Sequence, residues 1–418
     1  MRGGWRALAV LLILVVTAGT SFAAGFRLPE AGAKAMGMAF AFTAQADDPS
    51  AIYFNPAGLT QLQGQNVMLG ATYIRENGAE FNGSTPLTGG AVINETQKSL
   101  NFVVPNAYYT YTTKDGWYSF GVGIFTPFGL GQEYESNSFF RNQVTKIELQ
   151  TLVFNPTIAF KINEYLSVGV GVDYMWGNVK YNKSPILPPQ LGGGTFQTEL
   201  EGDGQAWGWN FGLLFKPTEN LKVGFNYRSP FNLKVSDADF TAGNPQGTVP
   251  LPMGTTSASG TLKMPATATL GAAYTYGRLT VEVDGDWTFW HSYSDLTITN
   301  NDFPAYSSTA LKKWKDVCAF RMGAEYRVTD PLALRLGFSY DPTPAPDATL
   351  GPELPDATRM NYNVGVGYKI GKVTIDAAFM YIDRFDRTVN NLSPAGTGMN
   401  GTWKGDAWLA GLDVAYKF

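Results

Sequence analysis

Apolar and polar residues alternate with a period of two along most of this chain, most clearly in its last segment. In residues 408–418, Leu412, Val414, Tyr416 and the terminal Phe418 fall on one face of an extended strand, and small or charged residues fall on the other. Successive side chains of a strand point to opposite faces, so the pattern predicts a strand with one apolar side. A strand that separates lipid from a wet lumen needs such a side.

The same alternation predicts fourteen strands. The expected spans are 65–75, 98–112, 116–126, 147–161, 165–180, 204–216, 220–229, 264–276, 278–290, 315–328, 331–340, 358–370, 372–384 and 403–418. The connections alternate in length: six are tight and rich in turn formers, and seven are long (76–97, 127–146, 181–203, 230–263, 291–314, 341–357 and 385–402). Short turns at one end and long loops at the other are typical of bacterial outer-membrane barrels.

Composition supports a membrane barrel over a soluble β-sandwich. Aromatic residues make up 14% and charged residues only 16%, against about 25% charged residues in soluble domains. After residue 23, the chain contains none of the runs of roughly 18 apolar residues that a membrane helix needs. Only a closed barrel then satisfies every backbone group in lipid. The expected fold is all-β: a 14-stranded antiparallel transmembrane β-barrel in residues 65–418, with both chain ends on the periplasmic side.

Residues 1–23 are predicted to be a secretory signal peptide. Arg2 and Arg6 precede a short apolar stretch, and Ser21-Phe22-Ala23 is a small-x-small cleavage site, so the mature chain would begin at Ala24. A single membrane anchor is the alternative, but the apolar run is too short for one. Removal of both arginines leaves 29 basic and 35 acidic residues, a net charge of −6 that argues against a nucleic-acid partner.

Residues 24–64 do not alternate and are predicted to form a hatch, or plug, inside the lumen. The segment is too rich in large apolar residues for a disordered tail. It would also close a pore that fourteen strands leave wide enough for water. The motif Asn55-Pro56-Ala57 is expected to fix the hatch to the wall, because Asn side chains cap turns and proline rigidifies them.

The chain offers little for catalysis, metal binding or disulfide formation. It has one cysteine, Cys318, and one histidine, His291, so we expect no metal and no cofactor. An outer-membrane hydrolase using His291 stays an open but unsupported alternative. A general porin is another, although the apolar hatch argues against an open lumen.

Several short motifs are spread along the chain: Ala24-Gly25-Phe26, the stretch 46–59 with Asn55-Pro56-Ala57, Thr126-Pro127-Phe128-Gly129, Tyr227-Arg228-Ser229-Pro230, Trp314-Lys315-Asp316, Tyr340-Asp341-Pro342-Thr343-Pro344 and Leu354-Pro355-Asp356. In these motifs the chain resembles the FadL/TodX family of outer-membrane transporters for long-chain fatty acids and other hydrophobic compounds. The resemblance covers nearly all of the predicted mature protein. The resemblance implies a hatch-plugged barrel, a hydrophobic groove among the outer loops, a tighter inner site, and an exit through a kink in strand three.

Strand three contains residues suited to such a kink. Gly121 and Gly123 lie in its interior, where glycine is permitted at a bulge, and Pro127 removes a ladder donor. The alternative for the glycines is that they are small lumen-facing residues.

Candidate substrate contacts come from the N-terminus and the first long outer loop after strand three. Phe26 is expected to fill an apolar pocket for which the ligand competes, with plain hatch packing as the alternative. Phe128, Leu130, Phe139 and Phe140 are expected to line the outer groove, or else to pack the loops into a cap.

A carboxylate head group would need an interior cation. Alternation places Lys315, Arg321, Glu325 and Arg327 on the lumen face, and the family resemblance suggests Lys315 as a head-group contact. Other lumen charges are Lys222, Arg228 and Arg335, with Glu282, Asp284 and Asp286 expected opposite Lys315. The alternative is a salt-bridge network that joins hatch and barrel.

Together with these features, the resemblance implies passive, ligand-gated diffusion of long-chain fatty acids or similar hydrophobic molecules across the outer membrane. The alternative substrate class is aromatic hydrocarbons. The expected partners are the transported molecule, outer-membrane lipid and lipopolysaccharide, and the expected oligomeric state is a monomer.

Overall fold

The computed structural model describes residues 25–186, 195–243, 254–392 and 397–418. The predicted signal peptide, residues 1–23, lies outside the described residues. Among the described residues, no helix is long and apolar enough to cross a membrane.

Fourteen antiparallel strands close into a barrel. In order around the wall they are β1 (Gly64–Glu76), β4 (Leu100–Thr112), β5 (Tyr118–Phe125), β7 (Lys146–Lys161), β8 (Leu166–Lys183), β9 (Gln197–Phe215), β10 (Leu221–Arg228), β13 (Thr267–Tyr276), β14 (Leu279–Thr288), β17 (Val317–Arg327), β18 (Leu332–Asp341), β19 (Arg359–Ile370), β20 (Val373–Arg384) and β23 (Asp406–Lys417). The barrel closes because β1 pairs with β4 on one side and with β23 on the other. Each predicted span overlaps one of these strands, so the predicted barrel is confirmed.

Three wall strands bend at a proline and continue outward as a second strand. β5 gives way to β6 (Gly129–Glu133) after Pro127, and β10 to β11 (Phe231–Gly243) after Pro230. β12 (Gly254–Met264) leads into β13 across Pro265. A proline cannot donate to the ladder, so the strand is interrupted there.

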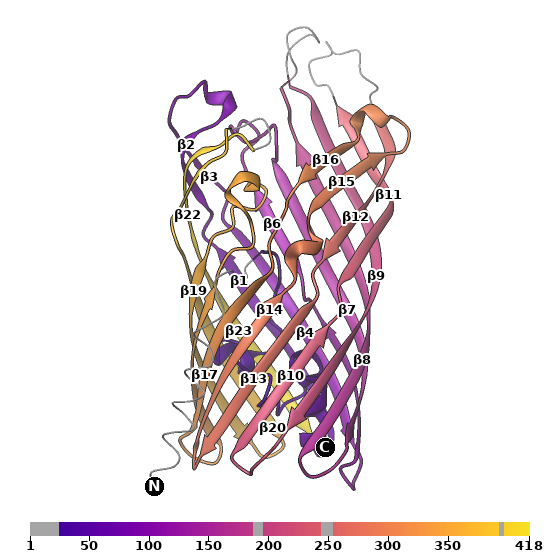
Figure 1. Cartoon of the computed structure of the whole chain (residues 1–418), viewed down its shortest axis with the longest axis vertical. Helices are drawn as coiled ribbons and strands as arrows, with labels where there is room; N and C mark the ends of the chain where they lie inside the picture. Colours follow the sequence, from indigo (N-terminus) through magenta and orange to yellow (C-terminus); the bar gives the residue numbers. More distant parts are fainter. Residues whose placement is uncertain (1–24, 187–194, 244–253, 393–396) are drawn as a thin grey trace.

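The long connections carry further structure above the barrel (Figure 1). A separate sheet consists of β21 (Arg387–Asn390), β22 (Asn400–Lys404), β2 (Glu80–Ser84) and β3 (Ile93–Thr96). The remaining outer elements are β15 (Asp295–Asn300), β16 (Ser308–Leu311), η2 (Pro86–Thr88), η4 (Trp290–Ser292), η5 (Pro304–Tyr306) and η6 (Asp347–Thr349). The C-terminus lies at the opposite end, beside the short turns (Figure 1). Gly116, Gly277 and Gly371 occupy three of these turns with positive φ, a conformation that favours glycine.

The two faces of the wall follow the predicted alternation. On β8, Val170, Val172 and Trp176 are exposed on the outer surface, whereas Gly171 and Asp173 are buried on the inner one. The outer surface is therefore a continuous apolar band suited to lipid, and charged side chains turn inward.

This arrangement predicts a large penalty for a charge on the outer face. Leu336, in the middle of β18, is 66% exposed. Leu336→Lys should lower the free energy of unfolding by about 2–4 kcal/mol, the cost of a lysine near the bilayer midplane. The measurement is urea unfolding in lipid vesicles. The control is Leu311→Lys on the exposed outer strand β16, which should have little effect.

The N-terminal segment lies inside the lower half of the barrel (Figure 1). It contains α2 (Ala33–Gly37), α3 (Ala51–Phe54) and η1 (Pro56–Gln61), and nearly all its residues between Phe26 and Leu59 are buried. Its backbone meets glycines of the wall: Gly37 approaches Gly365, so closely that a Cβ on Gly365 would lie 2.9 Å from the Gly37 Cα. The arrangement is consistent with the predicted hatch.

Candidate functional site

The wall is interrupted in strand three. The partner strand β7 pairs Val153 with Phe125 and Gln150 with Gly129. Between these two pairs strand three advances by four residues, whereas β7 advances by three. The extra residue is a bulge that contains Pro127. β4 pairs with β5 only between Ala107 and Thr112. The outer half of β4, residues 100–106, therefore has no β5 partner on this side. The ladder of strand three is therefore interrupted around Pro127.

The glycines expected at the kink lie elsewhere. Gly121 and Gly123 are in the regular part of β5, paired to both neighbouring strands. A Cβ on either would lie within 3 Å of Ile52 of the N-terminal segment, at 2.7 and 2.9 Å. Their small size therefore lets α3 approach the wall, and the expectation that they form the kink was wrong.

The bend is bonded to the beginning of the N-terminal segment. Leu28 N donates to Pro127 O at 2.9 Å, and Gly129 N donates to Phe26 O at 3.0 Å. Residues 26–28 thus act as a short strand beside the bend and satisfy backbone groups that the bulge leaves without ladder partners.

A cavity of about 640 Å³ lies at this interruption. Its inner lining comes from the N-terminal segment and the lumen face of the wall, including Phe26, Glu30 and Leu409, and its outer lining includes the lipid-facing residues Val103 and Leu152. The cavity therefore connects the lumen with the outer surface of the wall between β4 and β6. Its volume suits a small hydrophobic ligand.

A second cavity of about 140 Å³ lies beneath the outer loops. Phe26 and Leu130 line both cavities, so they lie where the two meet. Phe26 is enclosed by aromatic rings, with centroids 4.8 Å away at Trp290, 5.4 Å at Tyr293 and 5.8 Å at Trp314. We name these three residues the aromatic cage.

The other predicted loop contacts divide into two groups. Phe128 is buried, and its ring centroid lies 6.0 Å from that of Phe26. Phe140 is buried between Phe81 and Trp403 of the outer sheet, and Phe139 is 39% exposed beside them. Phe139 and Phe140 line neither of the two cavities, so this part of the loop packs into the cap.

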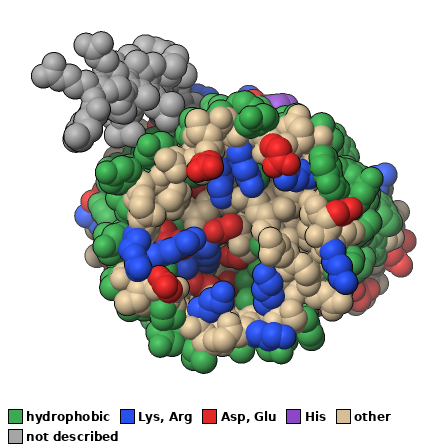
Figure 2. All heavy atoms as spheres, turned by 90° about the horizontal axis from the view of Figure 1, so that it is seen from below, with side chains coloured by type: hydrophobic (Ala, Val, Ile, Leu, Met, Phe, Trp, Pro, Cys, Tyr) green, Lys and Arg blue, Asp and Glu red, His purple; other side chains and the backbone are tan. Residues whose placement is uncertain are grey.

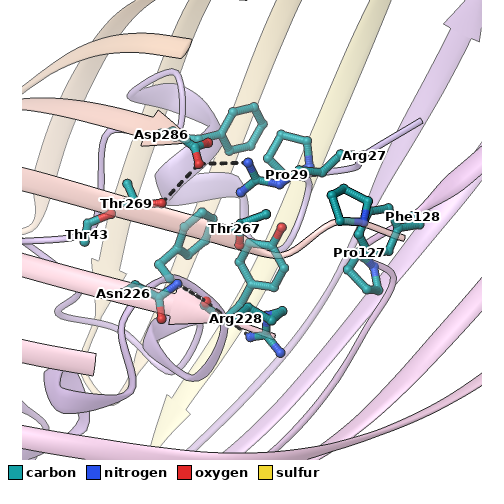
Figure 3. Close-up of a pocket in the computed structure, with 14 residues that line it drawn as sticks. Arg27, Pro29, Thr43, Pro127, Phe128, Asn226, Arg228, Thr267, Thr269 and Asp286 are labelled. Carbon is teal, nitrogen blue, oxygen red and sulfur yellow. Dashed lines mark hydrogen bonds and ion pairs between the residues drawn. The ribbon is translucent and has the colours of Figure 1, made fainter. Parts of the chain in front are cut away.

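The interior cations near the cavities are largely paired. Arg321 contacts Asp286 at 3.0 Å and Asp341 at 3.3 Å, and Arg27 contacts Asp286 at 2.8 Å. Figure 3 shows Arg27 and Asp286 in the lining of a small pocket to which Pro127 and Phe128 also contribute. Arg321 therefore belongs to the salt-bridge network that sequence reasoning gave as the alternative to a head-group site.

Lys315 does not face the lumen, contrary to prediction. β17 begins only at Val317, so the two-residue alternation does not extend back to position 315, and the Lys315 side chain is exposed. The buried lysine is Lys312, which lines the smaller cavity and pairs with Glu353. Desolvation is the largest single influence and opposes the charge of Lys312, but Glu353 together with Tyr293 and Tyr181 outweighs it, so the pKa of the ammonium group is raised.

The three acids of β14 contact the N-terminal segment. Asp284 accepts hydrogen bonds from the backbone N–H groups of Phe42 and Thr43, at 3.1 and 3.2 Å. Glu282 accepts from those of Ala44 and Gln45, at 2.6 and 2.8 Å. The sequence showed carboxylates two residues apart on one face, but not that backbone amides would be their partners.

The Asn55-Pro56-Ala57 motif contacts the wall, as expected. The Asn55 amide donates to Leu213 O of β9 at 2.9 Å and to Thr43 O at 2.8 Å, and its oxygen accepts from Ala57 N. Gly169 and Gly212 of the wall make room, since a Cβ on Gly169 would lie 2.5 Å from the Pro56 carbonyl carbon.

The buried carboxyl of Glu30 predicts that docking of the N-terminal segment depends on pH. Burial raises the pKa of Glu30 to about 7, partly offset by Arg359. A carboxyl whose folded pKa lies above its ordinary value of about 4.5 favours the docked state at low pH, and this contribution is lost as pH rises through 7. Hydrogen exchange, corrected for intrinsic rates, should show the segment opening roughly seventyfold more often at pH 8 than at pH 5. Glu30→Gln should reduce this difference, and an unchanged pH dependence would contradict the assignment.

Sequence reasoning missed several residues of this region. Arg27, Leu28, Trp290 and Lys312 were not singled out, and Trp314 was noted only as part of a motif. Tryptophan just outside a strand is ordinary in a barrel, so only the position of Phe26 between the rings reveals the cage.

The chain is similar to known outer-membrane proteins over nearly its whole length. A family model described as "Outer membrane protein transport protein (OMPP1/FadL/TodX)" matches residues 14–418. The long-chain fatty acid transport protein of Escherichia coli O6:H1 is 26% identical over 454 residues, covering 99% of this chain and 98% of the relative. The 47 kDa outer membrane protein of Pasteurella multocida is 27% identical over 436 residues, covering 97% and 96%.

Solved structures share the fold. A Pseudomonas aeruginosa FadL homologue superposes with a TM-score of 0.82 at 22% identity, covering 94% of this chain and all of that one, 100%. The Ralstonia pickettii toluene transporter TbuX gives a TM-score of 0.69 at 21% identity, covering 93% and 98%.

Proposed function

The chain belongs to the OMPP1/FadL/TodX family of outer-membrane transport proteins, and from this premise we propose that it admits long-chain fatty acids or similar hydrophobic molecules by passive, ligand-gated diffusion. It is an outer-membrane transport protein rather than an enzyme. The proposal concerns the substrate, the route and the gate.

The proposed route runs from the outer loops through both cavities and out through the wall. A ligand enters the smaller cavity, displaces Phe26 from the aromatic cage, and passes into the larger cavity. It leaves sideways between β4 and β6, at the bend near Pro127, and reaches the bilayer without crossing the hatch. Each CH₂ group removed from water contributes about 0.8 kcal/mol, so apolar contacts alone retain a long chain.

One observation carries this proposal: the cavity of about 640 Å³ is lined both by lumen residues and by lipid-facing residues of the wall. A porin would need an open axial lumen, and the buried N-terminal segment argues against one. We propose that this segment, residues 24–64, is a hatch fixed by Asn55-Pro56-Ala57, and that the protein acts as a monomer in contact with outer-membrane lipid and lipopolysaccharide.

Aromatic hydrocarbons are the second candidate substrates. The aromatic cage already accommodates one phenyl ring, that of Phe26, in edge-to-face and tilted contacts. Such contacts are each worth about 0.5–1.5 kcal/mol beyond the buried area. A monoaromatic ligand could replace this ring directly. The relatives named above include proteins described for each substrate class.

Filling the wall opening tests the route. A Cβ on Gly131 of β6 would lie 2.3 Å from the ring of Phe102 on β4, so Gly131→Leu should fill the space between the two strands. We expect uptake of labelled fatty acid or toluene to fall by about tenfold in cells lacking their own transporters, because a side chain in the path excludes the ligand.

The control is Gly285→Leu, because the atoms nearest to a Cβ at position 285 belong to the side chain of Trp287, and uptake should stay normal. Equal uptake by Gly131→Leu and the unaltered protein, at equal surface amounts, would argue against lateral exit.

A further inference from the structure

The short-turn end of the barrel, which faces the periplasm, carries an excess of basic side chains. Figure 2 views this end and shows lysine and arginine side chains around the rim, with acidic side chains both among them and deeper in the hollow. The chain as a whole has a net charge of −4. The basic rim is therefore a local feature rather than a consequence of composition.

Part of this rim forms a pocket of about 620 Å³. The end of the N-terminal segment, residues 60–64, lines one side, and the turns after β4, β7 and β9 line the other. Lys114, Lys161 and Lys216 all line it, with the hydroxyls of Thr60 and Ser167. We name it the mouth pocket. Ammonium, amide and hydroxyl donors around one hollow suit an anion.

The lysines exceed the acids available to them. Lys161 pairs with Glu164 at 3.1 Å. Asp115 accepts instead from the hydroxyl of Thr113 and from a backbone N–H. Among the described residues, neither Lys114 nor Lys216 has a carboxylate within 4.0 Å.

Positive charge is crowded at Lys216. Burial, followed by the neighbouring ammonium groups of Lys222 and Lys161, lowers the pKa of Lys216 to about 8. A half-buried ammonium group beside like charges is unfavourable unless an anion approaches it. Among the described residues no carboxylate lies within 4.0 Å of Lys216, and the more distant Asp47 offsets the neighbouring charges only in part, so an anion from outside would be a favourable partner.

We propose that the mouth pocket binds a phosphate-bearing anion, with Lys216 at its centre and Lys114 and Lys161 at its rim. Phosphate offers several acceptor oxygens, and charge-assisted hydrogen bonds to ammonium groups are among the strongest in proteins. The anion could be a soluble phosphate ester or the head group of an inner-leaflet phospholipid. The proposal does not depend on which molecule the barrel transports.

An anion bound in the mouth pocket would also affect the stability of the docked hatch. Lys222 donates to Gln61 at 2.6 Å, and Gln61 donates to the backbone oxygens of Gln45 and Ala46, at 2.7 and 3.0 Å. Thr60, in the pocket lining, donates to Ser167 of the wall at 2.8 Å. An anion shared by Lys216 and the end of the hatch adds a tie between hatch and wall and should slow hatch opening.

The test uses the purified full chain in detergent at low ionic strength, with glycerol 3-phosphate as the soluble probe in titration calorimetry. We expect saturable binding that Lys216→Gln weakens by about tenfold, the loss of one charge-assisted contact. Lys216→Arg should largely retain binding. The matched control is Lys372→Gln, which removes a lysine from another turn of the same face.

A second arm distinguishes the lipid source. In nanodiscs that contain phosphatidylglycerol, native mass spectrometry should detect retained lipid that Lys216→Gln loses and Lys372→Gln keeps. Binding in either arm with this selectivity supports the proposal and identifies the source. Absence of saturable binding in both arms, or equal weakening by Lys216→Gln and Lys372→Gln, overturns it.

Discussion

Gly224→Val is expected to make the barrel permeable to small hydrophilic solutes. A Cβ at position 224 would lie 2.2 Å from Thr43 O and 2.5 Å from the Thr43 carbonyl carbon, both backbone atoms of the N-terminal segment. Valine favours strands, so β10 itself should tolerate it. The segment must therefore move, at an overpacking cost of about 1–3 kcal/mol.

The expected effect is larger than this cost because the displaced loop is the one fixed by β14. Residues 42–45 donate four backbone hydrogen bonds to Glu282 and Asp284. Hydrogen bonds to charged groups contribute roughly 1.5–3 kcal/mol each. A shift that breaks them leaves two buried carboxyl groups without their backbone donors, so the hatch should release rather than adjust. A released hatch exposes a lumen that fourteen strands leave wide enough for water.

Liposome swelling with small sugars measures this permeability. We expect little swelling with the unaltered protein and rapid swelling with Gly224→Val. The control is Gly285→Val on β14, where the nearest atoms belong to the outward ring of Trp287. Heat-dependent mobility in gels would verify that both variants remain folded barrels. Slow swelling of a correctly folded Gly224→Val barrel would show that the hatch accommodates the added methyl groups.

The wall was predictable from sequence because lipid imposes a strict rule on every strand. Each residue of β8 or β18 must be apolar outside or compatible with the lumen inside, so the pattern can be read locally. The bend at Pro127 was predictable for a similar reason, since proline acts on its own strand. The outer continuations β11 and β12 were not predicted, because turn formers around Pro230 and Pro265 make them look like one long loop.

The interior of the barrel was less predictable because its contacts join distant segments. Whether Arg321 meets a ligand or an acid depends on Asp286 and Asp341, and alternation gives only its side of the wall. Gly121 and Gly123 look like sites of flexibility, yet they serve close packing against Ile52. Lys315 was misplaced because alternation has no meaning before a strand begins. The two-residue period of the sequence shows which face of the wall a side chain lies on. Its role depends on contacts with distant segments, which the period does not show.

Phe26→Ala should increase the affinity for hydrophobic ligand if Phe26 is the gate. In the unaltered protein a ligand must first displace a buried phenyl ring from contact with Trp290, Tyr293, Trp314 and Phe128. A site that is available only part of the time binds with an apparent dissociation constant raised by that fraction. Truncation of a buried phenylalanine to alanine typically lowers the free energy of unfolding by about 3–5 kcal/mol. This cost indicates how strongly the Phe26 ring competes with a ligand for the same space. In Phe26→Ala, a ligand that fills the space left by the ring recovers part of this free energy. We therefore expect the variant to bind the hydrophobic ligand about tenfold more tightly than the unaltered protein does.

Titration of the purified protein with a long-chain fatty acid and, separately, with toluene would measure this change and compare the two substrate classes. The space left by the Phe26 ring is lined by aromatic side chains, and an apolar cavity of that kind accepts a small aromatic molecule. A larger gain for toluene than for the fatty acid would favour aromatic hydrocarbons as substrates. Phe139→Ala is the matched control, because Phe139 lies in the loop cap and lines neither cavity. Weaker binding of both ligands by Phe26→Ala would mean that the ring is part of the binding surface, and the gate would then have to lie elsewhere in residues 26–28.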